Sequence, residues 1–83
     1  MPNDERNALI AEEHRSIRRM QFVVDLVEAT IAQDRTITID EAWDHVRSLK
    51  AVVVTIFPGK EDTFDLIYLP RFSRLIGEKF PAN

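Results

Sequence analysis

The first third of the chain places apolar residues on two sides of one predicted helix, residues 4–34. The longer stripe has helical spacing and consists of Ile10, Ile17, Met20, Val24, Val27 and Ile31. A shorter stripe consists of Phe22, Leu26 and Ala29. At about 100° per residue, Phe22 and Leu26 point roughly away from the longer stripe. Because a helix in a lone bundle needs only one buried face, the second stripe predicts a partner, most simply a second copy of this chain.

A second helix is predicted over residues 39–57. Thr38 and Glu41 have the spacing of a capping box, in which each residue covers an exposed amide of the first turn. The apolar residues that follow keep helical spacing up to Pro58: Ile39, Ala42, Trp43, Val46, Leu49, Val53 and Ile56. Residues 51–57 are also rich in β-branched side chains, so a hairpin over residues 51–69 is the alternative. We favour the helix, because neither candidate strand alternates cleanly and an isolated two-stranded sheet is marginal.

The last predicted helical segment covers residues 61–80. Acidic residues begin it and basic residues lie towards its end, as the helix dipole favours. Its apolar residues are Phe64, Ile67, Tyr68, Phe72, Leu75, Ile76 and Phe80. Pro70 has no amide hydrogen to donate and restricts Leu69, so we expect a kink or break near Leu69.

These segments predict an all-α fold: a small three-helix, or three-plus-one, bundle with a long N-terminal helix and a Pro-kinked C-terminal helix. The chain has 83 residues, enough for one helical domain, 1–83, in which residues 1–7 can fray. The first helix would be about 45 Å long and the second about 28 Å. Part of the first helix should therefore project beyond the bundle or pack against another chain.

Composition narrows the class of protein. The chain is 45% apolar and 30% charged, has a formal net charge of −3 and contains no cysteine. The acidic balance makes nucleic-acid binding unlikely, and the absence of cysteine excludes disulfides and thiolate metal sites. The N-terminus does not resemble a signal peptide and there is no long apolar run, so we expect a cytoplasmic protein that does not enter the membrane.

The sharpest local feature is a cluster of arginines on the first helix. Arg15, Arg18 and Arg19 lie within about one turn, and neither Arg18 nor Arg19 has an acidic residue three or four positions away. An arginine fork suits a phosphate or carboxylate. The alternatives are salt bridges, within the chain or across a dimer, to Asp44, Glu61, Asp62 or Asp65, or simple solvation. Phe22 and Leu26 lie beside these arginines, and an apolar patch rimmed by arginine is typical of a protein–protein contact.

Other chemistry has little support in the sequence. Glu41 and His45 have a spacing that could hold a metal, but two ligands do not make a site. The three serines all lie inside predicted helices, and no phosphate-binding loop is present. We therefore expect no catalytic residue, no metal and no cofactor.

The functional hypothesis is a small self-associating helical interaction or accessory protein without enzyme activity. Its contact residues would be Arg15, Arg18, Arg19, Phe22 and Leu26. The expected partner is a second copy in a homodimer, or an unidentified protein. The alternative is a protein that binds nucleic acid or another anionic ligand through the same arginines.

Overall fold

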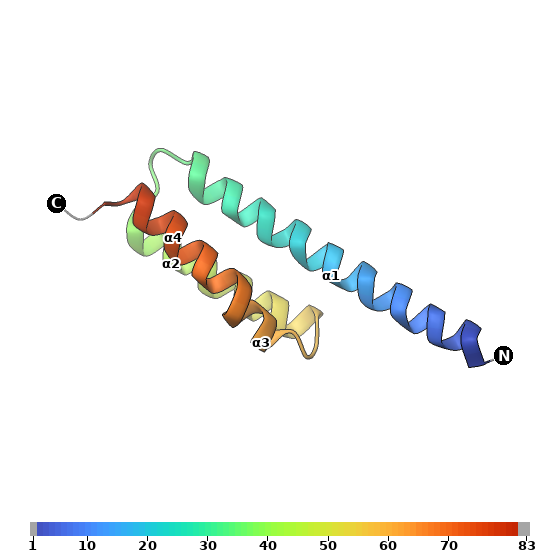
Figure 1. Cartoon of the computed structure of the whole chain (residues 1–83). Coiled ribbons are helices and arrows are strands. Elements are labelled where there is room, and N and C mark those ends of the chain that lie inside the picture. Colours follow the sequence, from blue (N-terminus) through green and yellow to red (C-terminus); the bar gives the residue numbers. More distant parts are fainter. Residues whose placement is uncertain (1, 82–83) are drawn as a thin grey trace.

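The computed structural model describes residues 2–81, with side chains from Asp4 onward. The long helix α1 (Pro2–Gln33) is followed by α2 (Ile39–Ile56), a single turn α3 (Glu61–Thr63), a π-helical turn η1 (Phe64–Tyr68) and α4 (Leu69–Lys79) (Figure 1). Every regular element of this part of the chain is helical, which confirms the all-α bundle. The alternative hairpin over residues 51–69 is wrong, because residues 51–56 continue α2 and residues 61–69 are helical.

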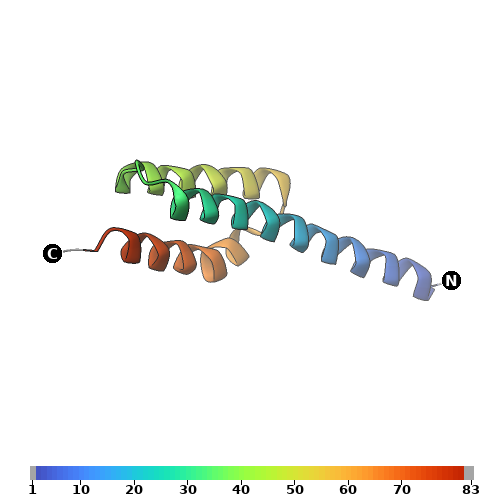
Figure 2. The same cartoon turned by 90° about the horizontal axis from the view of Figure 1, so that it is seen from above.

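Three helical segments form the bundle, and each runs antiparallel to the one before it in the chain (Figure 1). In the view of Figure 1, α2 and α4 lie below α1, and the view from above places α1 between them (Figure 2). The described chain measures 61 × 20 × 19 Å. Its length comes from α1, whose N-terminal part runs well beyond the other helices, as the predicted helix lengths require. We call residues 4–12 of α1 the arm.

The joint between α1 and α2 is fixed by local hydrogen bonds. The Thr36 backbone amide and hydroxyl both donate to Asp34 Oδ1, at 2.9 and 2.8 Å. These two hydrogen bonds lower the pKa of Asp34, and the bond from the amide has the larger effect. The predicted capping box is present: the Glu41 amide donates to Thr38 Oγ1, and the Thr38 amide donates to Glu41 Oε1. Two consecutive local devices therefore set where α1 ends and α2 begins.

The hydrophobic core lies where the three segments meet. Phe64 contributes the central ring, with ring centroids 6.3 Å from Tyr68 and 6.4 Å from Phe72. The Phe64 and Phe72 rings are stacked, whereas the Tyr68 ring is tilted against Phe64. The buried set is Met20, Val24, Ile31, Ile37, Ala42, Val46, Leu49, Val53, Phe57, Phe64, Tyr68, Phe72 and Ile76.

The expected kink at Leu69 takes the form of a π-helical turn. The Leu69 amide donates to the Phe64 carbonyl, five residues back, and Pro70 follows in the first turn of α4. A continuous α-helix would force the Pro70 ring against the carbonyl of residue 66. The wider π turn accommodates the proline without ending the helical path.

Ion pairs tie the segments together at their edges. Arg71 of α4 reaches α1, with Nη2 2.6 Å from Glu28 Oε2 and 3.5 Å from Asp25 Oδ1. Lys50 of α2 lies 2.9 Å from Asp65 Oδ1, and its hydrogen bond to the Asp65 carboxylate raises the pKa of Lys50. Lys60, just before α3, pairs with Glu13, which leaves α1 without a tertiary ion pair on the N-terminal side of Glu13 among the described residues.

Several apolar residues assigned to core stripes are exposed instead. Ile10 lies in the arm, where no other helix reaches it. Ile39 lies in the first turn of α2 and Ile67 in the π turn, whose wider winding rotates it out of the stripe. Helical spacing predicted which side of each helix is apolar, but not how far along that side the other helices extend to cover it.

Candidate interaction surface on α1

The two sides of α1 have opposite environments over the same stretch of helix. Met20 and Val24 are 0% exposed, whereas Phe22 and Leu26 are 63% and 52% exposed. All four are large apolar residues, so only their angular position on the helix separates them. Phe22 and Leu26 therefore lie on the outer side of α1, as their spacing predicts, and nothing within the described chain covers them. Ala29, the third residue of the predicted second stripe, is half-buried.

The side chain of Phe22 borders an open groove between α1 and the end of α2. This groove has a volume of about 420 Å³ and is lined by Arg18, Arg19, Phe22, Val23, Ile56 and Phe57. Four of the six lining residues are apolar, and the two arginines form its charged edge. The structure therefore brings Phe22, Arg18 and Arg19 to one place, as the sequence analysis proposed.

A second hollow adjoins the first along α1. Its volume is about 320 Å³, and it is lined by Glu12, Arg15, Ser16, Arg19, Ile56 and Phe57. Arg19 borders both hollows, so the two form one continuous surface that runs from the end of the arm to Phe22. This surface collects all three arginines of the predicted cluster. Leu26 lies one helical turn beyond Phe22 and extends the apolar strip.

Ile56 also contributes to this surface, although its spacing predicts a place in the core stripe of α2. It is 62% exposed and borders both hollows. Phe57, four residues after Val53, takes the next buried position, and Ile56 is rotated by about 100° to its side. The signal was available: Val52 and Ile56 form an apolar i, i+4 pair beside the stripe, and both are exposed. We call Phe22, Leu26 and Ile56 the outer patch.

Arg15, Arg18 and Arg19 form no salt bridge with the rest of the described chain. The expected intrachain partners are engaged elsewhere or lie apart: Asp44 pairs with Arg47, while Glu61 and Asp65 pair with Lys50. None of the predicted salt bridges to Asp44, Glu61, Asp62 or Asp65 is present within the described chain, and salt bridges across a dimer stay a prediction. These acids belong to the C-terminal half of the chain, where Arg47 and Lys50 pair with three of them.

The end of α2 provides part of the compensation for these arginines. Arg15 and Arg19 share their hollow with Ile56 and Phe57, which close α2, and the last turn of α2 contains no basic residue. The C-terminus of a helix carries a partial negative charge that favours nearby cations, by about 0.3–1 kcal/mol at exposed sites. Arg18 does not border this hollow, but it shares the adjoining groove with the same two residues of α2.

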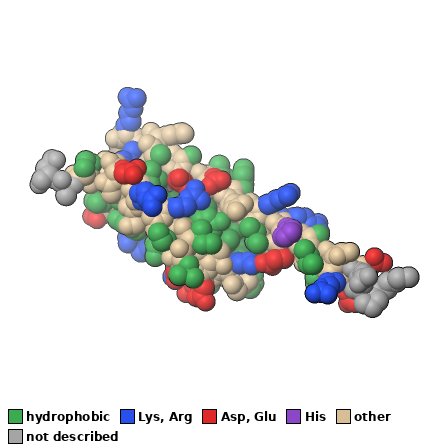
Figure 3. All heavy atoms as spheres, in the orientation of Figure 1, with side chains coloured by type: hydrophobic (Ala, Val, Ile, Leu, Met, Phe, Trp, Pro, Cys, Tyr) green, Lys and Arg blue, Asp and Glu red, His purple; other side chains and the backbone are tan. Residues whose placement is uncertain are grey.

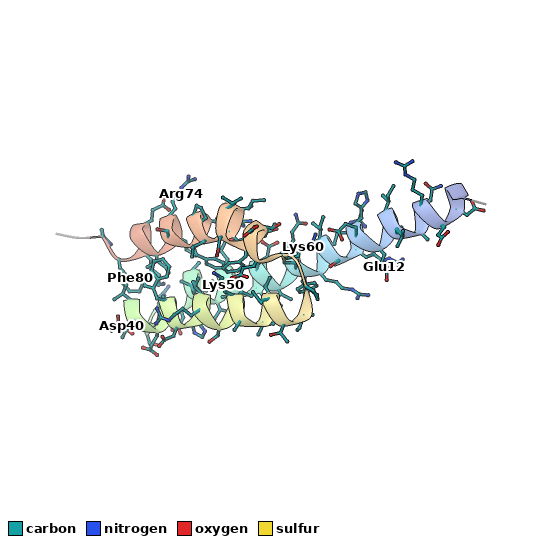
Figure 4. The ribbon with its side chains drawn as sticks, turned by 90° about the horizontal axis from the view of Figure 1, so that it is seen from below. Glu12, Asp40, Lys50, Lys60, Arg74 and Phe80 are labelled. Carbon is teal, nitrogen blue, oxygen red and sulfur yellow. The ribbon has the colours of Figure 1, made fainter. Side chains whose placement is uncertain are left out.

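The arm has no packing of its own. Every residue from Asp4 to Arg15 is exposed, including the apolar residues Leu9 at 63% and Ile10 at 48%. Figure 4 shows Glu12 on the stretch of α1 beyond the loop that carries Lys60. In the space-filling view, the arm presents hydrophobic and charged side chains side by side (Figure 3). A helix end with exposed leucine and isoleucine is a second unpartnered surface.

The remaining candidate chemistry does not assemble into a site. His14 and His45 are both exposed, and Glu41 is engaged in the capping box of α2. Nowhere in the described chain do three potential metal-ligating side chains come together. None of the helices, over their described residues, is both long and apolar enough to cross a membrane.

Comparison with known families, curated proteins and solved structures found no match to this chain. Its function must therefore be argued from its own surface.

Proposed function

We propose that this chain is a small helical interaction protein that associates with a second copy of itself through the outer side of α1. It would act as an accessory or scaffold protein rather than as an enzyme. The observation that supports this most is the outer patch, where Phe22 and Ile56 are each more than 60% exposed beside one groove. Clustered large apolar residues edged by arginine have the composition of a protein–protein contact.

The size of the chain supports the same proposal. A domain of this length buries a modest fraction of its unfolded surface, and it has no disulfide to stabilise it. Association is then a direct way to remove further apolar surface from water. Two-fold dimers are the commonest closed assemblies, because one patch can serve both copies.

Sedimentation equilibrium tests the proposal. The mass should be twice 9.6 kDa, and Phe22→Glu should shift it to the monomer while helical circular dichroism is retained. Leu66→Glu is the matched control, because Leu66 is 77% exposed on η1, away from the groove. It should leave the mass unchanged. A wild-type monomer at about 100 μM would contradict the proposal, since self-association is driven by concentration.

The unpaired arginines support a second candidate, binding of an anionic ligand such as nucleic acid. Arg15, Arg18 and Arg19 lie along one stretch of α1 without a salt bridge in the described chain. Titration with duplex DNA at about 50 mM salt tests it, because phosphate contacts are strongest at low ionic strength. Binding that Arg18→Glu with Arg19→Glu abolishes would favour this candidate, and absence of binding would retire it.

A further inference from the structure

The arm and two residues of the outer patch, Phe22 and Leu26, lie on α1, and both surfaces are uncovered in a single copy. The arm is helical for several turns, and all of its residues are exposed and form no ion pair with the rest of the described chain. An isolated helix of this length is marginal in water, and most helices in proteins are stabilised by packing of an apolar face. The outer patch has apolar surface and no cover. We propose that the arm of each copy packs on the outer patch of the other, in an antiparallel pair of α1 helices. This inference rests on the proposed self-association and specifies its geometry.

Charge favours this pairing over a parallel one. The arm carries Asp4, Glu5 and Glu12 against a single basic residue, Arg6, whereas the middle of α1 carries three arginines. A parallel pair in register would place arginines against arginines, which is destabilising. An antiparallel pair instead places the acidic end of each helix against the basic middle of the other.

One register satisfies the charged and apolar residues together. If Glu12 lies opposite the partner's Arg19, then Ala8 lies opposite the partner's Val23 and Glu5 opposite the partner's Leu26, because all of these pairs are symmetric about the point between Arg15 and Ser16 and share one face of α1. Glu12 and Arg19 are seven residues apart and border the same hollow, so they share a face of α1. Glu12 also lies about one turn from the partner's Arg15, which reduces the repulsion between the two Arg15 side chains near the axis.

The extent of this contact suits a stable dimer. In this register the helices overlap over about 24 residues, or about 36 Å. Stable interfaces bury about 800 Å² on each partner, roughly one eighth of the 6310 Å² that this chain exposes. Neither the arm nor the outer patch is large enough alone to form such an interface. In a two-fold pair, however, the contact between an arm and an outer patch occurs twice, once on each side of the axis.

Charge reversal tests the pairing in the full-length chain. By sedimentation equilibrium, Glu12→Arg and Arg19→Glu should each weaken the dimer about tenfold, since each reversal acts twice across the axis. The two substitutions in one chain, or an equal mixture of the two single variants, should restore association. Arg74→Glu on α4 is the control and should have no effect. Helical circular dichroism should be unchanged in all variants.

The outcomes separate the two proposals. A monomeric wild-type chain would overturn self-association itself. A wild-type dimer that neither single reversal weakens would overturn only the exchange of arms, and so would weakening that the double substitution fails to reverse. A dimer that Phe22→Glu dissociates but charge reversal does not would place the contact on the outer patch without the arm.

An engineered disulfide between two copies provides an independent test of where the proposed two-fold axis lies. The natural chain has no cysteine, so Ser16→Cys introduces a single thiol beside the proposed two-fold axis. Oxidation should link two copies at a protein concentration where the wild type is dimeric. Ser48→Cys, on the exposed side of α2, should remain unlinked. Equal linking of both variants, or of neither, would overturn the proposed axis.

Discussion

The two halves of α1 show how one continuous helix can be stabilised in different ways. Residues 4–15 are exposed on every side, whereas Met20, Val24 and Ile31 are completely buried against α2 and α4. Both halves contain leucine, isoleucine or valine at helical spacing. The difference lies in the length of the neighbouring helices, which end before they reach the arm (Figures 1 and 2). The buried half is held by tertiary packing, and the arm of a single copy is held by helix propensity alone.

The largest expected effect comes from shortening one apolar side chain to alanine in each half of α1. Met20→Ala should lower the free energy of unfolding by about 2–5 kcal/mol, because it leaves a cavity in the core. Ile10→Ala, in the arm and off the proposed contact line, should change it by less than about 0.5 kcal/mol. Urea denaturation of both variants measures these values. An Ile10→Ala loss as large as that of Met20→Ala would mean that the arm is packed in solution.

Much of the architecture could be predicted from the sequence because it depends on local signals. The start of α2 follows from the capping box of Thr38 and Glu41, and the irregularity before Pro70 follows from its missing amide. The choice of helix over hairpin rested on the stripe that keeps helical spacing from Ile39 to Ile56, in which Leu49 and Val53 are buried although its two end residues are exposed. Each of these features is determined within a few residues along the chain.

The features that were missed depend on where one element ends against another. Ile10 has the correct spacing for the core, but α2 ends before it. Ile56 is correctly spaced too, but Phe57 takes the final buried position. The arginines were expected to pair with acids within the chain or across a dimer, and within the described chain Arg47 and Lys50 pair with three of those acids instead. Position along the bundle axis decides the exposure of Ile10, and the choice between two neighbouring residues for one buried position decides that of Ile56. A single sequence contains little information about either.

A smaller effect should separate the starts of the two long helices. Thr38→Ala removes the capping oxygen of α2 and should cost about 1 kcal/mol of unfolding free energy. Asp4→Ala acts on the first turn of α1, where the arm frays without unfolding the bundle, so it should cost less than about 0.3 kcal/mol. Thermal denaturation compares the two, and Thr38→Ser, which keeps the oxygen, should restore most of the loss. Equal costs would contradict independent fraying of the arm.

Matched glycine substitutions should separate local from global stability. Ala11 in the arm and Ala51 in α2 are both exposed helical alanines. Ala51→Gly should lower the global unfolding free energy by about 0.5–1 kcal/mol, the usual cost of glycine inside a helix. At concentrations where the chain is monomeric, Ala11→Gly should leave global unfolding unchanged and speed hydrogen exchange of the arm amides alone. Exchange that slows in the arm as protein concentration rises would show that association orders it.

The smallest effect concerns pH at the opposite end of α1 from the arm. Because the Thr36 amide and hydroxyl bind its carboxylate, Asp34 has a folded-state pKa below its ordinary value. Its charge therefore stabilises the folded chain above about pH 4, and this contribution is lost as pH falls through the lowered pKa. Asp34→Asn keeps an oxygen that can accept the bonds but removes the titration. Wild type should therefore lose its stability advantage over Asp34→Asn between about pH 5 and pH 2, as measured by thermal denaturation.

Thr36→Val keeps the amide donor and removes the hydroxyl, so it should show a weaker pH dependence than wild type. If wild type and Asp34→Asn instead fall in parallel with pH, the carboxylate does not hold the end of α1, and the joint depends on the capping box of α2 alone.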